Sequence, residues 1–211
     1  MAYDLEEQEQ IENIKSWWQQ YGNLVMLAVI ACLLTIAAVQ GWRYYRAHQT
    51  QNAAALYGQL DVAERLNDHK KVRDIAAQIM DHYGSTQYAG MAALSAAKAS
   101  FTTGELDAAQ KNLQWAIDHA REDEMRDVAR LRLAGVLLDQ KKYDEALKLL
   151  SVEPRPSYAG LYADRRGDVL AAQGKAAEAR SAYQVALEKS DARSQYRSVI
   201  EMKLDALGQA K

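Results

Sequence analysis

The chain contains very few of the residues that interrupt helices or crosslink a fold. Its 211 residues include two prolines, one phenylalanine and one cysteine, Cys32. So little proline, together with abundant alanine and leucine, favours helices over strands. Because Cys32 is alone, the chain can form no internal disulfide and no thiolate metal site, so an oxidising compartment would not harm it.

The chain also lacks an excess of charge of one sign. It has 26 lysines and arginines against 28 aspartates and glutamates, for a formal net charge of −2. Without a basic excess, nucleic acid is not expected as a main partner. The length allows one soluble domain with a sizeable core, in addition to any membrane segment.

Residue patterns typical of catalysis are missing as well. The sequence has no glycine-rich phosphate loop, no nucleophile elbow and no cysteine–histidine pairing. Its four histidines are spread along the chain and none belongs to a histidine–carboxylate set with metal-binding spacing; they are His48, His69, His82 and His119. The sequence therefore predicts no enzyme, no cofactor and no metal.

One long apolar run stands out in this charged chain. No charged residue lies between Lys15 and Arg43, and residues 24–39 are all apolar except Thr35. A helix over residues 21–42 would be about 33 Å long, which matches a bilayer hydrocarbon core of about 30 Å. Aromatic rings that favour the lipid headgroup layers lie at both ends of the run: Trp17, Trp18 and Tyr21 at one end, Trp42, Tyr44 and Tyr45 at the other. We expect a transmembrane helix over residues 21–42, in contact with the lipid bilayer, after a short acidic segment over residues 1–20.

Two other interpretations of the run are weaker. A core helix of this length with no polar stripe would need a larger surrounding domain. A cleaved signal peptide would need a basic leader, whereas the first 15 residues carry five acidic residues and one lysine. The orientation stays open, because Lys15 on one side and Arg43 with Arg46 on the other nearly balance.

Beyond the anchor, the chain repeats a pattern of turn, spacer and small-residue helix. The three stretches are "GELDAAQKNLQWAI", "KKYDEALKLLSV" and "GKAAEARSAYQVAL". Their matching alanines, Ala109, Ala146 and Ala179, are 37 and 33 residues apart, close to the tetratricopeptide period of about 34. Small residues at these places would let paired helices cross closely. The spacing predicts three tetratricopeptide-like helical hairpins over residues 87–192.

The remaining segments complete an all-α fold. We expect residues 43–86 to form connecting helices, a degenerate repeat, on the apolar stripe of Ala53, Leu56, Leu60 and Ala63. Residues 193–211 are expected to form a C-terminal capping helix over the open end of the stack. The predicted fold class is thus a helical-hairpin solenoid preceded by one N-terminal transmembrane helix. A generic helical bundle is the alternative, but it would not need a fixed repeat period.

The first helices of such hairpins would line a groove suited to binding protein chains. Apolar and sulfur-containing side chains in a groove adapt well to extended or partly folded segments. The candidate positions are Met91, Leu94, Lys98, Phe101, Val128, Leu131, Leu138, Leu161, Asp164 and Asp168. Alternatively, several of them are inter-helix core. Since Lys98 is the single base in this set, capture of a C-terminal carboxylate by a clamp of lysines is disfavoured.

Several strings resemble one known family. These are the acidic leader, "GWRYYRAHQ" after the apolar run, "LRLAGVLLDQKKYDEALKLL" in the middle and "ADRRGDVLAAQGKAAEARSAY" near the end. They are similar to the ancillary subunit of the bacterial Sec translocon, a single-pass inner-membrane protein with a periplasmic tetratricopeptide domain. The stretch "SVEPRPSYAG" departs from the family, and the family offers no catalytic residue to transfer.

The resemblance implies a topology and a set of partners. The N-terminus would be cytoplasmic and the solenoid periplasmic, beside the Sec translocon. The partners would be a membrane-anchored periplasmic chaperone of the prolyl-isomerase class and exported client proteins. We therefore expect a non-enzymatic, chaperone-like accessory factor that assists newly translocated proteins, since tethering near the exit raises effective concentration. A scaffold docking a folded partner in envelope assembly, and a cytoplasmic regulator, are the alternatives.

Overall fold

The computed structural model describes residues 2–208, with side chains from Gln10 onward. Residue 1 of the expected acidic segment and residues 209–211 of the expected capping segment lie outside the described residues. Contacts divide the chain into two units, one ending at His48 and the other starting at Gln49, and each is described by itself. Throughout residues 2–208 the regular elements are helices.

The first unit belongs to the helix α1 (Ala2–Arg65), which contains the apolar run. Only 6% of its most apolar window is buried by protein. A core helix would be covered on most sides, so this degree of exposure disfavours the core-helix interpretation. Ring pairs lie at both ends of the run, with centroids 5.8 Å apart for Trp17 and Tyr21 and 6.3 Å apart for Trp42 and Tyr45. The helix is long and apolar enough to cross a membrane, which indicates membrane anchoring.

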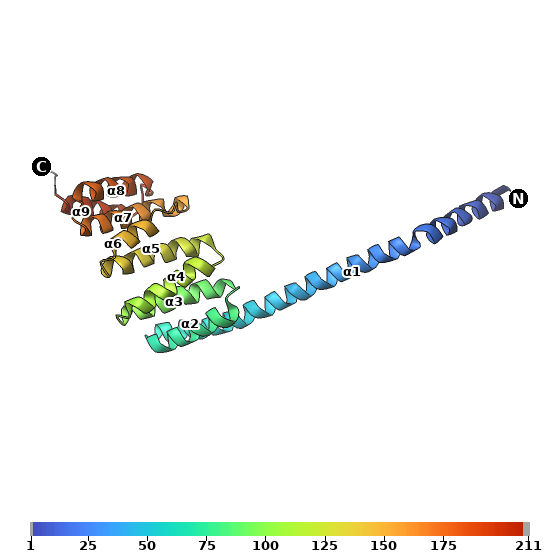
Figure 1. Ribbon diagram of the computed structural model, residues 1–211, viewed down its shortest axis with the longest axis horizontal. Coiled ribbons are helices and arrows are strands. Elements are labelled where there is room, and N and C mark those ends of the chain that lie inside the picture. Colours follow the sequence, from blue (N-terminus) through green and yellow to red (C-terminus); the bar gives the residue numbers. More distant parts are fainter. Residues whose placement is uncertain (1, 209–211) are drawn as a thin grey trace. The chain divides into compact units, whose positions relative to one another are not determined.

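The second unit is a stack of helical hairpins followed by a final helix (Figure 1). In the first hairpin, Leu60 and Ala63 near the end of α1 share a buried cluster with Val72 and Ile75 of the next helix. The remaining elements in order are α2 (His69–Tyr83), α3 (Gln87–Thr102), α4 (Leu106–His119), α5 (Asp123–Asp139), α6 (Tyr143–Leu149), the 3-10 helix η1 (Pro156–Tyr158), α7 (Ala159–Ala172), α8 (Ala176–Lys189) and α9 (Tyr196–Ala206). This arrangement confirms the predicted all-α, tetratricopeptide-like class.

The turn inside each hairpin is the same structure repeated four times. One residue in each turn has a positive φ, between 53° and 78°; these residues are Asn67, Gly104, Lys141 and Gly174, separated by 37, 37 and 33 residues. The amide of the following residue then donates to the carbonyl five positions back, at 2.8 to 3.0 Å. Such a left-handed residue closes the end of a helix and satisfies its free carbonyls. Asn67 shows that the degenerate segment contains a complete first hairpin.

Small residues hold the two helices of a hairpin close together. Ala109, Ala146 and Ala179 are all fully buried, which confirms the packing role predicted for the repeated alanines. In the last hairpin, Gly167 of α7 lies against the ring of Tyr183 of α8, and a methyl group on Gly167 would overlap that ring. Close packing of this kind leaves little room for volume change.

The stretch "SVEPRPSYAG" connects the third and fourth hairpins and is attached to α5. Arg155 places its Nε 3.4 Å from the buried Asp127 carboxylate and its Nη2 3.3 Å from Glu124. Tyr162 of α7 donates its hydroxyl to the same Asp127 carboxylate at 3.3 Å. Burial, and then the charge of Asp127, raise the pKa of Tyr162 to about 12. These contacts fix the position of one hairpin relative to the next.

Two glycine substitutions test the close approach of α7 and α8. We expect Gly167→Ala to lower the free energy of unfolding by about 1 to 3 kcal/mol, because the new methyl group displaces the Tyr183 ring. The matched control is Gly135→Ala, whose methyl group would come no closer than 3.8 Å to Arg165. That change should raise the free energy of unfolding by about 0.5 to 1 kcal/mol through helix propensity. Thermal unfolding of the full chain, followed by circular dichroism, measures both; equal effects would contradict the packing argument.

Candidate protein-binding groove

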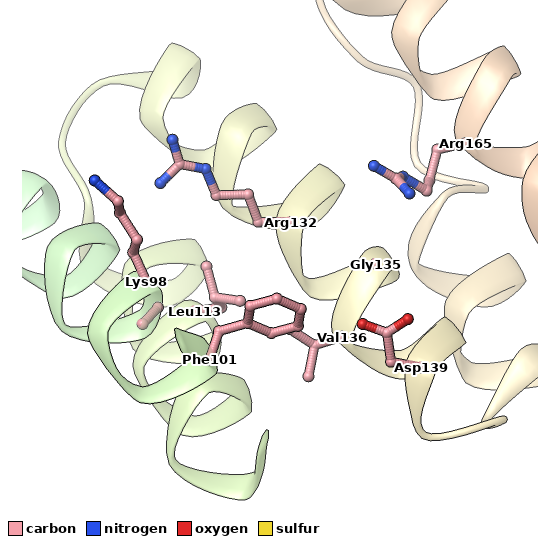
Figure 2. Close-up of a pocket in the computed structure, with 9 residues that line it drawn as sticks. Lys98, Phe101, Leu113, Arg132, Gly135, Val136, Asp139 and Arg165 are labelled. Carbon is pink, nitrogen blue, oxygen red and sulfur yellow. The ribbon is translucent and has the colours of Figure 1, made fainter. Parts of the chain in front are cut away.

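A groove of about 420 Å³ lies on the second unit where α3, α5 and α7 come together. Its lining residues are Ala97, Lys98, Phe101, Leu113, Arg132, Gly135, Val136, Asp139 and Arg165. Figure 2 shows the nitrogen ends of Lys98, Arg132 and Arg165 along one side of the groove, opposite an apolar group of Phe101, Leu113 and Val136. The groove therefore combines an apolar floor with a cationic edge.

Two local features of the sequence create the open space. Gly135 has no side chain, so the Arg165 guanidinium extends over α5 at this point. Phe101, the single phenylalanine of the chain, lies near the end of α3 and is 46% exposed. An exposed aromatic ring in a concave site can cover a large apolar area of a ligand.

A second hollow of about 270 Å³ adjoins the groove and shares Lys98 and Arg132 with it. Its other lining residues are Tyr57, Glu64, Met91, Leu94, Ser95 and Met125. Methionine side chains are flexible and polarizable, so they adapt to ligands of different shape. We call the groove and this hollow together the binding groove. On each side of a central cationic pair, Lys98 and Arg132, it combines apolar side chains with one carboxylate, Glu64 or Asp139.

The cations of the binding groove are only weakly engaged by the protein itself. Lys98 lies 4.0 Å from Glu64 and Arg165 lies 3.4 Å from Asp168. Arg132 makes no hydrogen bond or ion pair with any other residue that the structure describes. Exposed pairs at such distances contribute little stability, so these cations remain able to bind an anion.

The helix α9 is attached to α7 by a polar network around Asp164, which is buried, and Asp168, which is partly buried. Asp164 of α7 accepts hydrogen bonds from the Tyr196 hydroxyl at 2.6 Å and from Lys203 Nζ at 2.8 Å. Asp168 accepts from the Tyr183 hydroxyl at 2.9 Å and lies 2.7 Å from Lys203 Nζ. Burial first, and then the neighbouring carboxylates, raise the pKa of both Tyr183 and Tyr196. The network supplies hydrogen-bond and ion-pair partners to two carboxylates, whose burial without partners would cost folding free energy.

The described residues offer no group of three histidine, cysteine, aspartate or glutamate side chains placed to hold a metal ion. The Asp164 and Asp168 carboxylates are already occupied by Lys203 and two tyrosines. The binding groove is therefore the candidate site within the described part of the chain.

Comparison with known proteins identifies the family. A tetratricopeptide repeat-like domain family matches residues 15–209. An ancillary SecYEG translocon subunit of Neisseria gonorrhoeae is 32% identical over 98% of this chain and 100% of its own length. The chain belongs to the ancillary SecYEG translocon subunit family. Two further members, from Escherichia coli and Haemophilus influenzae, are 29% and 27% identical over 95% and 98% of this chain. In each case the alignment covers 96% or more of the relative's own length.

For this member of the ancillary SecYEG translocon subunit family, the structure brings part of the sequence-predicted set together. Met91, Leu94, Lys98 and Phe101 of α3 all line the binding groove. Leu94, however, is only 8% exposed. It belongs to the central core cluster, the group of buried residues around Leu113, Leu133 and Leu137. Of these four, Phe101 and Lys98 present the most accessible side chains.

None of the three positions expected on α5 lines the groove, and two of them, Leu131 and Leu138, lie one residue away from the lining residues Arg132 and Asp139. Val128, Leu131 and Leu138 pack against the central core cluster. The groove is instead lined by Arg132, Gly135 and Asp139. One residue along a helix turns the side chain by about 100°, which separates a core-facing from a groove-facing position. The repeat spacing in the sequence could have identified Arg132. It precedes Arg165 by 33 residues, the same distance that separates the turn residues Lys141 and Gly174, so the two arginines occupy equivalent positions in successive hairpins.

The positions expected on α7 are outside the groove. Leu161 is partly exposed and lines neither hollow. Asp164 and Asp168 lie under α9, where Tyr196 and Lys203 bind them. The terminal helix thus closes the α7 end, and Arg165 is the single α7 residue among those lining the groove.

The α9 network can be tested by removing one donor. We expect Lys203→Met to destabilise the attachment of α9 by about 1 to 3 kcal/mol, since the Asp164 and Asp168 carboxylates lose their cation. Hydrogen exchange of the full chain should become faster over α9 and stay unchanged over α3 and α4. Met202→Ala, on the solvent side of the same helix, is the control and should leave α9 exchange slow. Equal exchange in the two variants would exclude the network as the attachment.

Proposed function

We propose that this protein is a membrane-anchored, non-enzymatic accessory factor at the Sec translocon that binds newly translocated proteins. The observation that carries the proposal is the binding groove, in which an exposed Phe101 and the methionines Met91 and Met125 surround a cationic centre. Membership of the ancillary SecYEG translocon subunit family supports the translocon as partner. Because that partner resides in the bacterial inner membrane, α1 would be anchored there.

The tether makes weak binding by the groove useful. A protein confined beside the translocon meets emerging chains at high effective concentration, so individual contacts need not be tight. In this proposal residues 21–42 form the membrane span, the N-terminus is cytoplasmic and the second unit is periplasmic. The groove would hold exported clients and hand them to a membrane-anchored periplasmic chaperone of the prolyl-isomerase class. The absence of cysteine outside the span suits an oxidising compartment.

A single substitution in the groove tests client binding. We expect Phe101→Asp to reduce crosslinking to exported chains several-fold, because a charge would replace the apolar ring that contacts them. The matched control is Val152→Asp, at a position with the same 46% exposure outside the binding groove. Leu94→Asp is unsuitable, since Leu94 is part of the core and its loss would disturb folding. Crosslinks are measured with a photoreactive residue placed in both backgrounds at Thr102, an exposed position beside Phe101 that does not line the binding groove.

The outcomes of this experiment separate the proposal from its rivals. Unchanged crosslinking in Phe101→Asp would contradict client binding in the groove. One folded partner, crosslinked in fixed stoichiometry, would instead support a scaffold in envelope assembly. Circular dichroism of both variants should show the helical content of the unsubstituted chain.

The orientation of the anchor needs a separate experiment. A reporter active only in the periplasm, fused after the last residue, should be active, and protease added to spheroplasts should digest the second unit. The same reporter fused before the first residue is the control and should be inactive. The reverse pattern would place the solenoid in the cytoplasm and favour a regulatory role.

A further inference from the structure

We infer that the binding groove selects protein segments in which an acidic residue lies between apolar residues, and that Lys98 and Arg132 bind the acidic side chain. The inference rests on the proposed function and adds a selectivity to it. The two cations come from different helices, α3 and α5, and both line the groove and the adjoining hollow. They therefore lie where the two hollows meet.

The charges of these two side chains are not used by the fold. Arg132 is exposed and has no hydrogen-bond or ion-pair partner among the residues from 2 to 208. Lys98 leaves 70% of its side chain exposed and has Glu64 at 4.0 Å. In a protein of net charge −2, an unpaired arginine and a loosely paired lysine on facing helices form a local positive site. A carboxylate between them would gain charge-assisted hydrogen bonds.

The shape of the groove favours an internal acidic side chain over the carboxylate at a chain end. Apolar surface continues past the cationic pair on both sides, toward Phe101 and Val136 in one hollow and toward Met91 and Met125 in the other. A bound segment can therefore run through the cationic centre and place apolar residues on each side of it. A chain that ended at the cations would leave one of the two hollows empty.

The acidic residues of the groove restrict where a second acid could bind. Glu64 lines one hollow and Asp139 lines the other, so each flank of the cationic centre carries a carboxylate. Like charges placed close together repel, which disfavours acidic residues at the flanks of the bound segment. The preferred segment is thus apolar, acidic, apolar, with neutral or basic residues beyond.

Binding of designed peptides to the full chain in nanodiscs of neutral lipid tests this selectivity. The first probe is an amide-capped, fluorescent peptide with one glutamate between two leucine–phenylalanine pairs; the second has glutamine in its place. A third probe keeps the glutamine and one leucine–phenylalanine pair but ends in a free carboxylate. We expect the glutamate peptide to bind about 5 to 10 times more tightly than the glutamine peptide, an effect between that of an exposed ion pair and that of a buried hydrogen bond to a charged group. Added salt should reduce this difference.

Protein variants assign the difference to the cationic pair. Arg132→Gln should remove most of the preference for glutamate, and Lys98→Gln should reduce it. The control is Arg166→Gln, another exposed arginine that lines a separate hollow with Leu170 and Val185; it should keep the preference. A double-mutant cycle between the Arg132 variant and the two capped peptides isolates the interaction.

Three results would overturn the inference. One is equal binding of the glutamate and glutamine peptides, and another is an equal effect of Arg132→Gln and Arg166→Gln. The third is tighter binding of the free-carboxylate peptide, which would assign the cations to chain ends. If Phe101→Asp still weakens both capped peptides in the first two cases, client binding in the groove stands and only the acidic selectivity fails. If neither capped peptide binds the unsubstituted chain, both proposals fail.

Discussion

Close approach of the two helices in each hairpin is the constraint on which the second unit depends. The buried alanines of the repeats, and Gly167 beneath the Tyr183 ring, leave no space for larger side chains. Helices this close bury their facing surfaces completely, so the side chains that contact the next hairpin must come from the flanks. The repeated left-handed turn keeps each pair in the same geometry. Stacking of the hairpins then follows from the same few positions used repeatedly.

The binding groove is a by-product of this stacking. The second helix of each hairpin, and the flanks of the first helix, pack against neighbouring helices. One face of the first helices α3 and α5 lines the binding groove instead. Some residues on that face, such as Leu94 and Val136, also belong to the core, whereas Phe101, Arg132 and Gly135 do not. These last three supply the groove with an apolar ring, a charge and an open space. The most exposed groove residues are thus those that the core does not use.

The fold could be predicted from the sequence because the packing constraint recurs at a visible period. The groove could be predicted only in part. The sequence identifies Phe101 because α3 has a clear helical register. On α5 the groove-lining residue is Arg132, whereas the predicted Leu131, one position earlier, faces the core. The prediction favoured apolar side chains for the groove and therefore chose Leu131, but this side chain packs against the core. The contact between Lys203 and Asp164 could not be predicted, because the two residues are 39 positions apart and no local sequence pattern links them.

The attachment of α9 also has a meaning for copies of the protein that share a membrane. An uncovered last hairpin would present the same kind of surface that each hairpin offers to its successor, and a neighbouring molecule's first hairpin could dock there. Contacts of that head-to-tail type produce rings where the rotation closes and open filaments where it does not. With α9 held by Asp164 and Asp168, the final surface carries the exposed Glu201 and Asp205 instead. The helix α9 therefore occupies the face of the last hairpin on which a second copy would dock, and gives that face a negative charge.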